Sequence, residues 1–145
     1  MIIFSFNIRG LGRGSKLISL RWLFDVIKPD IVFIQETMAP ASKACQYFLK
    51  NFLRWEVCAT NVLRHSGGLL CVWNPSSCDF LSYYSSAGIL LDGRIKSCEE
   101  SLRLVNCYGT YRDREAYWKN IEESGLLLEQ NLILGRDLNF TLSSS

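Results

Sequence analysis

The sequence predicts a layered fold of the α/β or α+β class, with two sheets packed face to face and helices on the outside. An apolar run at residues 2–6, a helical pattern over 16–27 and an apolar run at 31–34 have the order of a βαβ unit. Residues 55–107 contain short β-rich runs separated by turn signals, which predicts an antiparallel meander. A helical pattern over 113–124 then precedes a last apolar run at 131–134.

The first third of the chain supplies the predicted βαβ unit. Residues 8–15 follow the first strand and contain three glycines, so we expect a loop there. The helix over 16–27 has Ser15 as its expected N-cap and ends before Pro29, because the residue before a proline is disfavoured in helical geometry. Its expected buried face follows the helical period and consists of Leu17, Leu20, Phe24 and Ile27. A second helix is expected over 42–53.

The remaining elements are shorter. We expect strands over 55–59, 69–73, 80–84, 89–91 and 102–107, with Asp92-Gly93 forming a hairpin turn. The helix over 113–124 is expected to begin at an N-cap, Asp113, and to end before Gly125. The side chains expected on its buried side are Tyr117, Trp118 and Ile121. The apolar run at 131–134 stops at Gly135, which predicts a buried strand that leaves the core at this point.

Length and composition indicate one globular domain, residues 1–145. The chain is long enough to bury a core, and its 48% hydrophobic and 21% charged residues exclude a disordered chain. The net charge of +2 is too small to indicate a nucleic-acid partner by itself. No apolar run approaches the ~20 residues of a membrane span, so no membrane association is expected.

The cysteines indicate a reducing compartment. Six are present, none in a C-x-x-C pair, and the single histidine, His65, makes a closed zinc site improbable. The apolar run at the N-terminus is too short for a secretion signal, so we expect free thiols and an intracellular protein that is not secreted. His65 is expected at the surface, without a catalytic role.

Polar side chains follow four of the apolar runs. Asn7 ends the first, Gln35-Glu36 the second, Tyr108 the run at 102–107, and Asp137 with Asn139 the last. If these strands are parallel neighbours, their ends converge, and ligands of layered folds bind at such ends.

The chemistry of this set suits Mg²⁺, which prefers one or two carboxylates together with water and substrate phosphate. Glu36 would then hold the metal, and Asp137 would hold or deprotonate a water. The groups expected to donate to a phosphate are Asn7, Asn139 and Tyr108.

Basic residues flank the same predicted edge. Arg9, Arg13 and Lys16 come shortly after Asn7, and Arg112 and Arg114 after Tyr108, as a polyanion site requires. The residues by themselves leave another interpretation open, because loops are commonly polar and Asp and Asn are ordinary turn residues.

Several segments resemble motifs of the endonuclease/exonuclease/phosphatase superfamily, and in particular the apurinic-type endonuclease domains of plant LINE (non-LTR) retrotransposons. The similarity follows the family order along nearly the whole chain. The matching segments are 5–11 (SFNIRGL), 28–37 (KPDIVFIQET), 67–70 (GGLL) with Trp73-Asn74, 106–109 (NCYG) with Arg114 and Trp118, and 135–140 (GRDLNF).

The resemblance implies a four-layer α/β/β/α sandwich of the DNase I-like type. It also implies phosphodiester hydrolysis that depends on Mg²⁺ (or Mn²⁺) and nicks DNA to prime reverse transcription. Glu36 would hold the metal, Asp137 would orient or activate water, and Asn139, Asn7 and Tyr108 would position the phosphate. The implied partners are DNA and a reverse transcriptase domain in the same polyprotein, which would place a functional protein in the nucleus.

The sequence departs from the family pattern in four respects. Arg136, Leu138 and Thr110 replace the usual Gly, Phe and Pro, and Arg136 is expected to disturb how Asp137 is aimed. The family's later Asp and its final Ser-Asp-His have no match up to Ser145. We therefore expect an N-terminal portion of the domain, incomplete at its C-terminus, marginally stable and inactive alone. Two alternatives remain: an inactive retroelement remnant that binds metal or DNA weakly, and a phosphatase or phosphodiesterase for another phosphoester.

Overall fold

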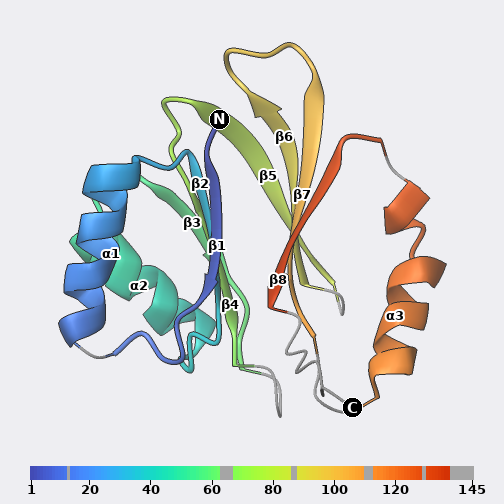
Figure 1. The fold of residues 1–145 in the computed structure, drawn as a ribbon, viewed down its shortest axis with the longest axis horizontal. Coiled ribbons are helices and arrows are strands. Elements are labelled where there is room, and N and C mark those ends of the chain that lie inside the picture. Colours follow the sequence, from blue (N-terminus) through green and yellow to red (C-terminus); the bar gives the residue numbers. More distant parts are fainter. Residues whose placement is uncertain (13, 63–66, 86–87, 110–112, 129, 138–145) are drawn as a thin grey trace, which may run out of the picture.

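The computed structural model describes residues 1–12, 14–62, 67–85, 88–109, 113–128 and 130–137, and for Asp137 it describes the backbone only. Two four-stranded sheets pack face to face, with α1 and α2 outside one sheet and α3 outside the other (Figure 1). The predicted α/β layered fold, with two sheets inside and helices outside, is confirmed.

The first sheet contains the predicted βαβ unit. Its strand order is β1-β2-β4-β3, with β1 (Ile3–Asn7) parallel to β2 (Ile31–Gln35). The crossover between them is α1 (Gly14–Ile27), as a parallel pair requires. β4 (Leu69–Trp73) runs antiparallel to β2 and to β3 (Glu56–Ala59).

Helices α1 and α2 (Ala41–Asn51) cover the outer face of this sheet. Leu20 and Phe48 are buried there, and Leu17 and Phe24 pack against the same cluster, as the helical period predicts. The predicted N-cap is wrong: the helix begins at Gly14, so Ser15 lies in its first turn. No helix in the described part of the chain has both the length and the apolar character needed to cross a membrane.

The second sheet has the order β5-β6-β7-β8, and β5 (Cys78–Ser85), β6 (Gly88–Ile95) and β7 (Ser101–Tyr108) form an antiparallel meander. The prediction of one meander from 55 to 107 is wrong for β3 and β4, which belong to the other sheet, where β4 pairs with β2 and β3 pairs with β4. Asp92-Gly93 is not a turn but part of β6, where a Cβ on Gly93 would lie 2.0 Å from the Asp79 carbonyl oxygen. The missing side chain lets two strands approach.

The last segment returns to the sheet through α3 (Arg114–Glu123), the short 3₁₀ turn Leu126–Leu128 and β8 (Leu132–Asp137), which is parallel to β7. On α3 itself, Ile121 is buried as predicted, whereas Trp118 remains 36% exposed. Gly125 follows the helix with φ +71°, which confirms its predicted role at the C-terminus. Asp113 occupies the N-cap position, but its side chain makes no capping hydrogen bond within the described structure.

Gly135 lets the two sheets approach closely at β8. A Cβ at this position would lie 2.2 Å from Cδ2 of Phe33 on β2, and 3.3 Å from Oγ of Ser5 on β1. Phe33 is fully buried in the core between the sheets. The glycine that stops the last apolar run is therefore required by packing between the sheets.

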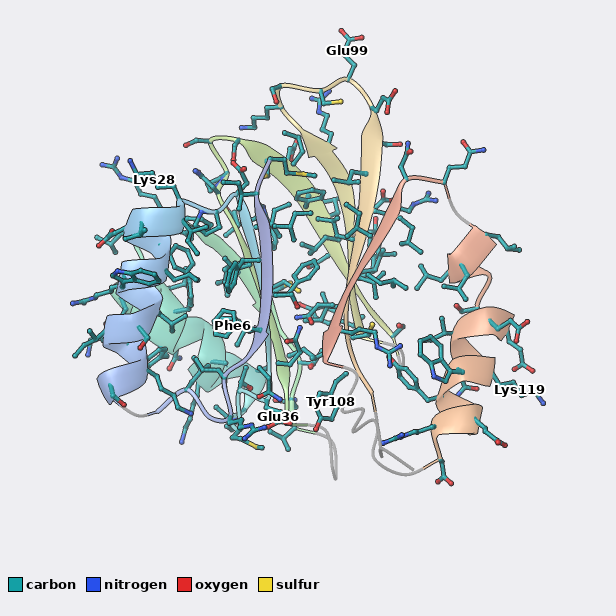
Figure 2. All side chains as sticks on the ribbon, viewed as in Figure 1. Phe6, Lys28, Glu36, Glu99, Tyr108 and Lys119 are labelled. Carbon is teal, nitrogen blue, oxygen red and sulfur yellow. The ribbon has the colours of Figure 1, made fainter. Side chains whose placement is uncertain are left out.

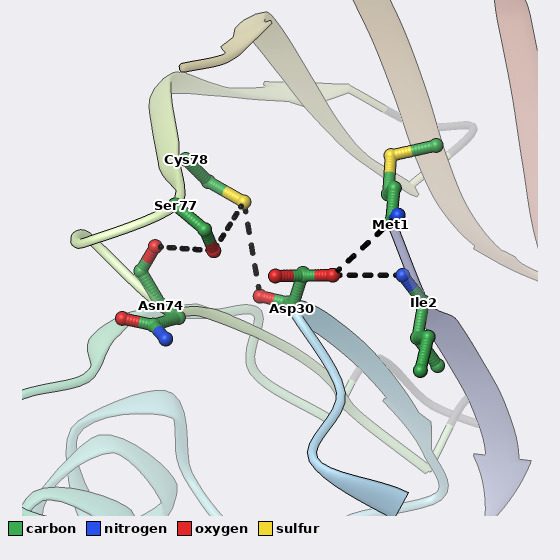
Figure 3. A network of polar contacts seen from close by, with 6 residues as sticks. All are labelled: Met1, Ile2, Asp30, Asn74, Ser77 and Cys78. Carbon is green, nitrogen blue, oxygen red and sulfur yellow. Dashed lines mark hydrogen bonds and ion pairs between the residues drawn. The ribbon is translucent and has the colours of Figure 1, made fainter. Parts of the chain in front are cut away.

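A polar network closes one end of the sandwich (Figure 3). Asp30 Oδ2 accepts a 2.8 Å hydrogen bond from the Ile2 amide and lies 4.0 Å from the terminal amine of Met1. The Asp30 carbonyl accepts the Asn74 amide at 2.9 Å and the Cys78 thiol at 3.9 Å. Asp30 thus joins the starts of β1, β2 and β5 at the end opposite the labelled Glu36 and Tyr108 (Figures 1 and 2).

Replacing Gly135 with alanine should destabilise the protein by about 1–3 kcal/mol, because the new Cβ overlaps Phe33 and core overpacking has this cost. The control is Gly14→Ala at the start of α1, where a Cβ would meet nothing within 4 Å. Urea unfolding of both variants measures the difference. Equal stability of the two variants would contradict the close approach of the sheets.

Candidate functional site

The four strands with polar ends are two parallel pairs in different sheets. β1 and β2 are neighbours in the first sheet, and β7 and β8 are neighbours in the second, so they do not form one sheet. Their ends nevertheless meet, because the sheets face each other with these pairs running in the same direction (Figure 1). Figure 2 shows Glu36 and Tyr108 together at that end. The expected convergence is confirmed for these two residues.

A hydrogen bond joins the two sheets at this point. Tyr108 Oη donates to Glu36 Oε1 at 2.9 Å, and the two residues are only 5% and 7% exposed. A buried carboxylate is stable only where polar partners replace water, and the phenol is one such partner. The bond fixes one oxygen of Glu36 and leaves the other for a ligand or solvent.

The backbone at Glu36 is held in a left-handed conformation with φ +55°, which is uncommon for a residue other than glycine. Arg9 and Met38, which flank the same site, also have positive φ. The Glu36 carbonyl accepts the Gly10 amide at 2.7 Å, and the Met38 amide donates to the Gly67 carbonyl at 2.6 Å. Strain of this kind is concentrated at functional sites, where surrounding contacts maintain it.

Gly67 and Gly68 form the wall against which Glu36 is packed. A Cβ on Gly67 would lie 2.7 Å from the Glu36 Cα, and one on Gly68, at φ +79°, would lie 2.4 Å from the Thr37 hydroxyl. Only glycine fits both positions. The sequence placed this pair in a segment that resembles a family motif, just before the strand expected at 69–73, but nothing in it indicated that the pair packs against Glu36.

Beneath the site, a pair of buried amides connects the sheets. Gln35 Nε2 donates to Asn106 Oδ1 at 2.7 Å and to Ser5 Oγ at 3.0 Å, and Asn106 Nδ2 donates to the Leu70 carbonyl at 3.0 Å. Gln35 and Asn106 are 1% and 0% exposed, so the network is shielded from water. Asn106 was not predicted as a site residue, although it immediately precedes Cys107 and Tyr108.

The end of β1 forms a loop that two side chains stabilise. Asn7 Oδ1 accepts the Arg9 amide at 2.9 Å. Lys16 Nζ donates to the carbonyls of Ile8 and Arg9, each at 2.5 Å. Lys16, predicted at the pocket edge, thus binds the backbone of this loop through its ammonium group. Arg9 is exposed beside Asn7, and Arg114 is exposed at the start of α3.

Arg136 lies away from the site. Its guanidinium carbon is 4.2 Å from the centre of the Trp118 ring, a cation–π contact on the side of the sheet that faces α3. Gly135, one residue earlier, faces Phe33 in the core, as strand alternation requires. This contact anchors β8 to α3. The expectation that Arg136 disturbs how Asp137 is aimed stays a prediction, because the Asp137 side chain lies outside the described structure.

Several predicted residues cannot be placed. The backbone of Asp137 pairs in register with Tyr108, so this residue lies at the same end of the sheet. Its side chain lies outside the described structure. Six other residues named in the sequence analysis also lie outside the described residues: Arg13, His65, Thr110, Arg112, Leu138 and Asn139.

No protein-family model and no curated protein sequence matches the chain. Solved structures do match. The endonuclease domain of TRAS1, a telomere-specific non-LTR retrotransposon, superposes with a TM-score of 0.67 and 16% identity, over 96% of this chain and 59% of that one. AP endonuclease LMAP from Leishmania major gives 0.71 and 13%, over 97% and 56%. TDP2 from D. rerio, complexed with a single-strand DNA product, gives 0.70 and 16%, over 96% and 60%.

The chain therefore has the DNase I-like fold of the endonuclease/exonuclease/phosphatase superfamily, as the motif resemblance implied. It spans less than two thirds of the length of these three structures. At 10–17% identity, the similarity establishes the fold alone.

The residues present fit a hard divalent cation. Mg²⁺ is commonly held by one or two carboxylates, with water and substrate phosphate completing its six oxygen ligands. Glu36 offers one carboxylate at the exit of a strand, in a fixed conformation. The described residues contain no group of three or more His, Cys, Asp or Glu side chains placed to hold a metal ion together.

Tyr108→Phe should destabilise the metal-free protein by about 1–3 kcal/mol, because it leaves a buried carboxylate without its phenol donor. A double-mutant cycle with Glu36→Ala, measured by urea unfolding in a chelator, isolates the contact. We expect a coupling energy of about 1 kcal/mol or more. Additive effects would show that the bond contributes nothing.

Proposed function

We propose that this chain is the N-terminal, metal-binding part of a divalent-metal-dependent phosphodiesterase that nicks DNA, of the kind encoded by LINE-type retrotransposons. The single observation that carries the proposal is the buried contact between Glu36 and Tyr108 at the converging ends of β2 and β7. The motif resemblance and the DNase I-like fold support the class of reaction.

Each described residue has a role in this proposal. Glu36 would hold Mg²⁺ (or Mn²⁺), which when bound would neutralise charge on a phosphate. Tyr108 acts on the metal site by fixing the Glu36 carboxylate. Asn7 would contribute its amide to positioning the phosphate.

Two assignments come from the motif alone: Asp137 would orient or activate the attacking water, and Asn139 would help to position the phosphate. Arg9 and Arg114, with Arg13 and Arg112 in the flanking loops, would bind the DNA backbone by charge.

The partners of the complete protein follow from the same resemblance. DNA is proposed as the substrate, in keeping with the DNA product bound in the D. rerio structure. A reverse transcriptase domain in the same polyprotein and a location in the nucleus are proposed on the resemblance to non-LTR retrotransposon endonucleases.

A second candidate is an inactive remnant that retains metal binding. The observations that favour it are that the chain spans 59% of the TRAS1 domain and that the described residues include no group of three or more side chains that could bind a metal. Such a chain would bind metal through Glu36 and leave DNA intact.

Mg²⁺ should raise the melting temperature of the chain, because a ligand that binds only the folded state stabilises it. Glu36→Gln should abolish this increase. The matched control is Glu99→Gln, an exposed carboxylate at the opposite end of the molecule, which should retain it (Figure 2). No effect of Mg²⁺ or Mn²⁺ on the unmodified chain would contradict both candidate functions.

Plasmid nicking separates the two candidates. In the endonuclease proposal, Mg²⁺-dependent conversion of supercoiled to relaxed plasmid should fall about 10²-fold or more in Glu36→Gln, a loss typical for groups that stabilise transition-state charge. Stabilisation by Mg²⁺ with no nicking above a no-protein control, both for this chain and for a version extended through the family's final motifs, would identify the remnant instead.

A further inference from the structure

Helix α1 is apolar on two faces. Its inner face is buried through Leu20 and Leu23, which are 2% and 8% exposed. Its outer face carries Ile18, Trp22 and Val26, which are 72%, 61% and 59% exposed. These three residues follow one another at intervals of four, so they form one continuous stripe along the helix. A helix that is apolar all round is normally covered on all sides.

This stripe of Ile18, Trp22 and Val26 differs from the exposed apolar side chains of the other described helices. α2 exposes Leu49 at 45% and α3 exposes Trp118 at 36%, each as the one large exposed apolar residue of its helix. Apolar side chains exposed singly are normal on a protein surface. Contiguous ones mark interaction sites, so the stripe is the feature that calls for a partner.

A groove beside α1 extends the same apolar surface. It has a volume of about 630 Å³ and is lined by Phe4 and Phe6 of β1 together with Ile18 and Trp22 of the stripe. β1 is an edge strand of the first sheet, and no described strand pairs with its other side. The apolar surface therefore runs from the outer face of α1 to the edge of the sheet.

The stripe is complementary to itself. A two-fold axis brings the same patch of two copies together, so the patch must match its own rotated image. If two α1 helices run antiparallel with the axis at Trp22, then Ile18 of one copy lies opposite Val26 of the other, because both are four residues from Trp22. The two indole rings meet at the centre, which is where interfaces concentrate their strongest aromatic contacts.

Two charges beside the stripe fit the same arrangement. Arg21 and Asp25 are both exposed, and each immediately precedes a member of the stripe, so they lie on one flank of it. In the antiparallel pair, Arg21 of one copy is offset from Asp25 of the other by two residues, or about 3 Å along the helix axis. Their side chains span that offset, and the symmetry forms the ion pair twice.

We propose that the outer face of α1 is a dimerisation face, and that its partner is a second copy of this chain. The two helices pack antiparallel across a two-fold axis at Trp22, and each stripe covers the other. Because α1 lies along the direction of the strands, the two copies point in opposite directions and both Glu36 ends stay open (Figure 1). The inference does not depend on metal binding or nuclease activity.

Sedimentation velocity of the full chain over about 1–100 µM should show an equilibrium between monomer and dimer. Dithiothreitol is included to exclude dimers linked through the exposed Cys98. Ile18→Ser should weaken dimerisation about tenfold or more, because an apolar contact is lost on both sides of the axis. The matched control is Leu81→Ser on β5 in the other sheet, which alters a side chain 66% exposed and should leave the equilibrium unchanged. Neither change should alter the circular dichroism spectrum, because both side chains are exposed.

Charge reversal tests the antiparallel geometry. Arg21→Asp and Asp25→Arg should each weaken dimerisation about tenfold, because like charges then face each other at two places in the dimer. The double variant should recover the dimer, because it restores opposite charges across the axis. An equal mixture of the two single variants should also recover it, since each copy then meets a partner of opposite charge.

A chain that stays monomeric over the whole concentration range would overturn the proposal and assign this face to a different partner. Assemblies larger than a dimer would also overturn it, because a two-fold contact closes on itself. The same holds if Leu81→Ser dissociates the dimer as Ile18→Ser does. Failure of both the double variant and the mixture to recover the dimer would likewise contradict the antiparallel contact.

Discussion

The hydrogen bond from Tyr108 to Glu36 is the contact on which the site depends, because it requires both sheets to be correctly packed. Tyr108 ends β7 and Glu36 follows β2, so their 2.9 Å contact exists only if the facing strands keep their register. Two features maintain that register beneath it: the bridge between Gln35 and Asn106, and the close approach of Gly135 to Phe33. Small residues and buried amides thus determine the geometry of an acidic site.

Local structure was largely predictable from the sequence, and strand pairing was not. The βαβ unit follows from helical periodicity and from Pro29, both of which act over a few residues. The assignment of β3 and β4 to the first sheet depends on the pairing of β4 with β2, which no local pattern encodes. Asp92-Gly93 has ordinary turn chemistry, yet packing against Phe80 and the continuous pairing of β6 override it.

The candidate site was predictable where strands end in polar residues, and unpredictable where residues distant in sequence meet. Glu36 and Tyr108 were expected from their positions after apolar runs. The partner of Gln35 lies 71 residues away, and no spacing rule connects them. The clamp formed by Gly67 and Gly68 likewise becomes apparent only when Glu36 is seen packed against it.

The central claim is that the end of the sandwich at Glu36 binds a divalent cation. Anomalous diffraction from crystals soaked in Mn²⁺ tests it directly, because Mn²⁺ replaces Mg²⁺ at oxygen sites and scatters anomalously. We expect a peak about 2.0–2.2 Å from the Glu36 carboxylate, in the range of Mg²⁺–oxygen contacts. A peak only elsewhere, or an ordered Glu36 with no peak beside it at saturating Mn²⁺, would contradict the claim.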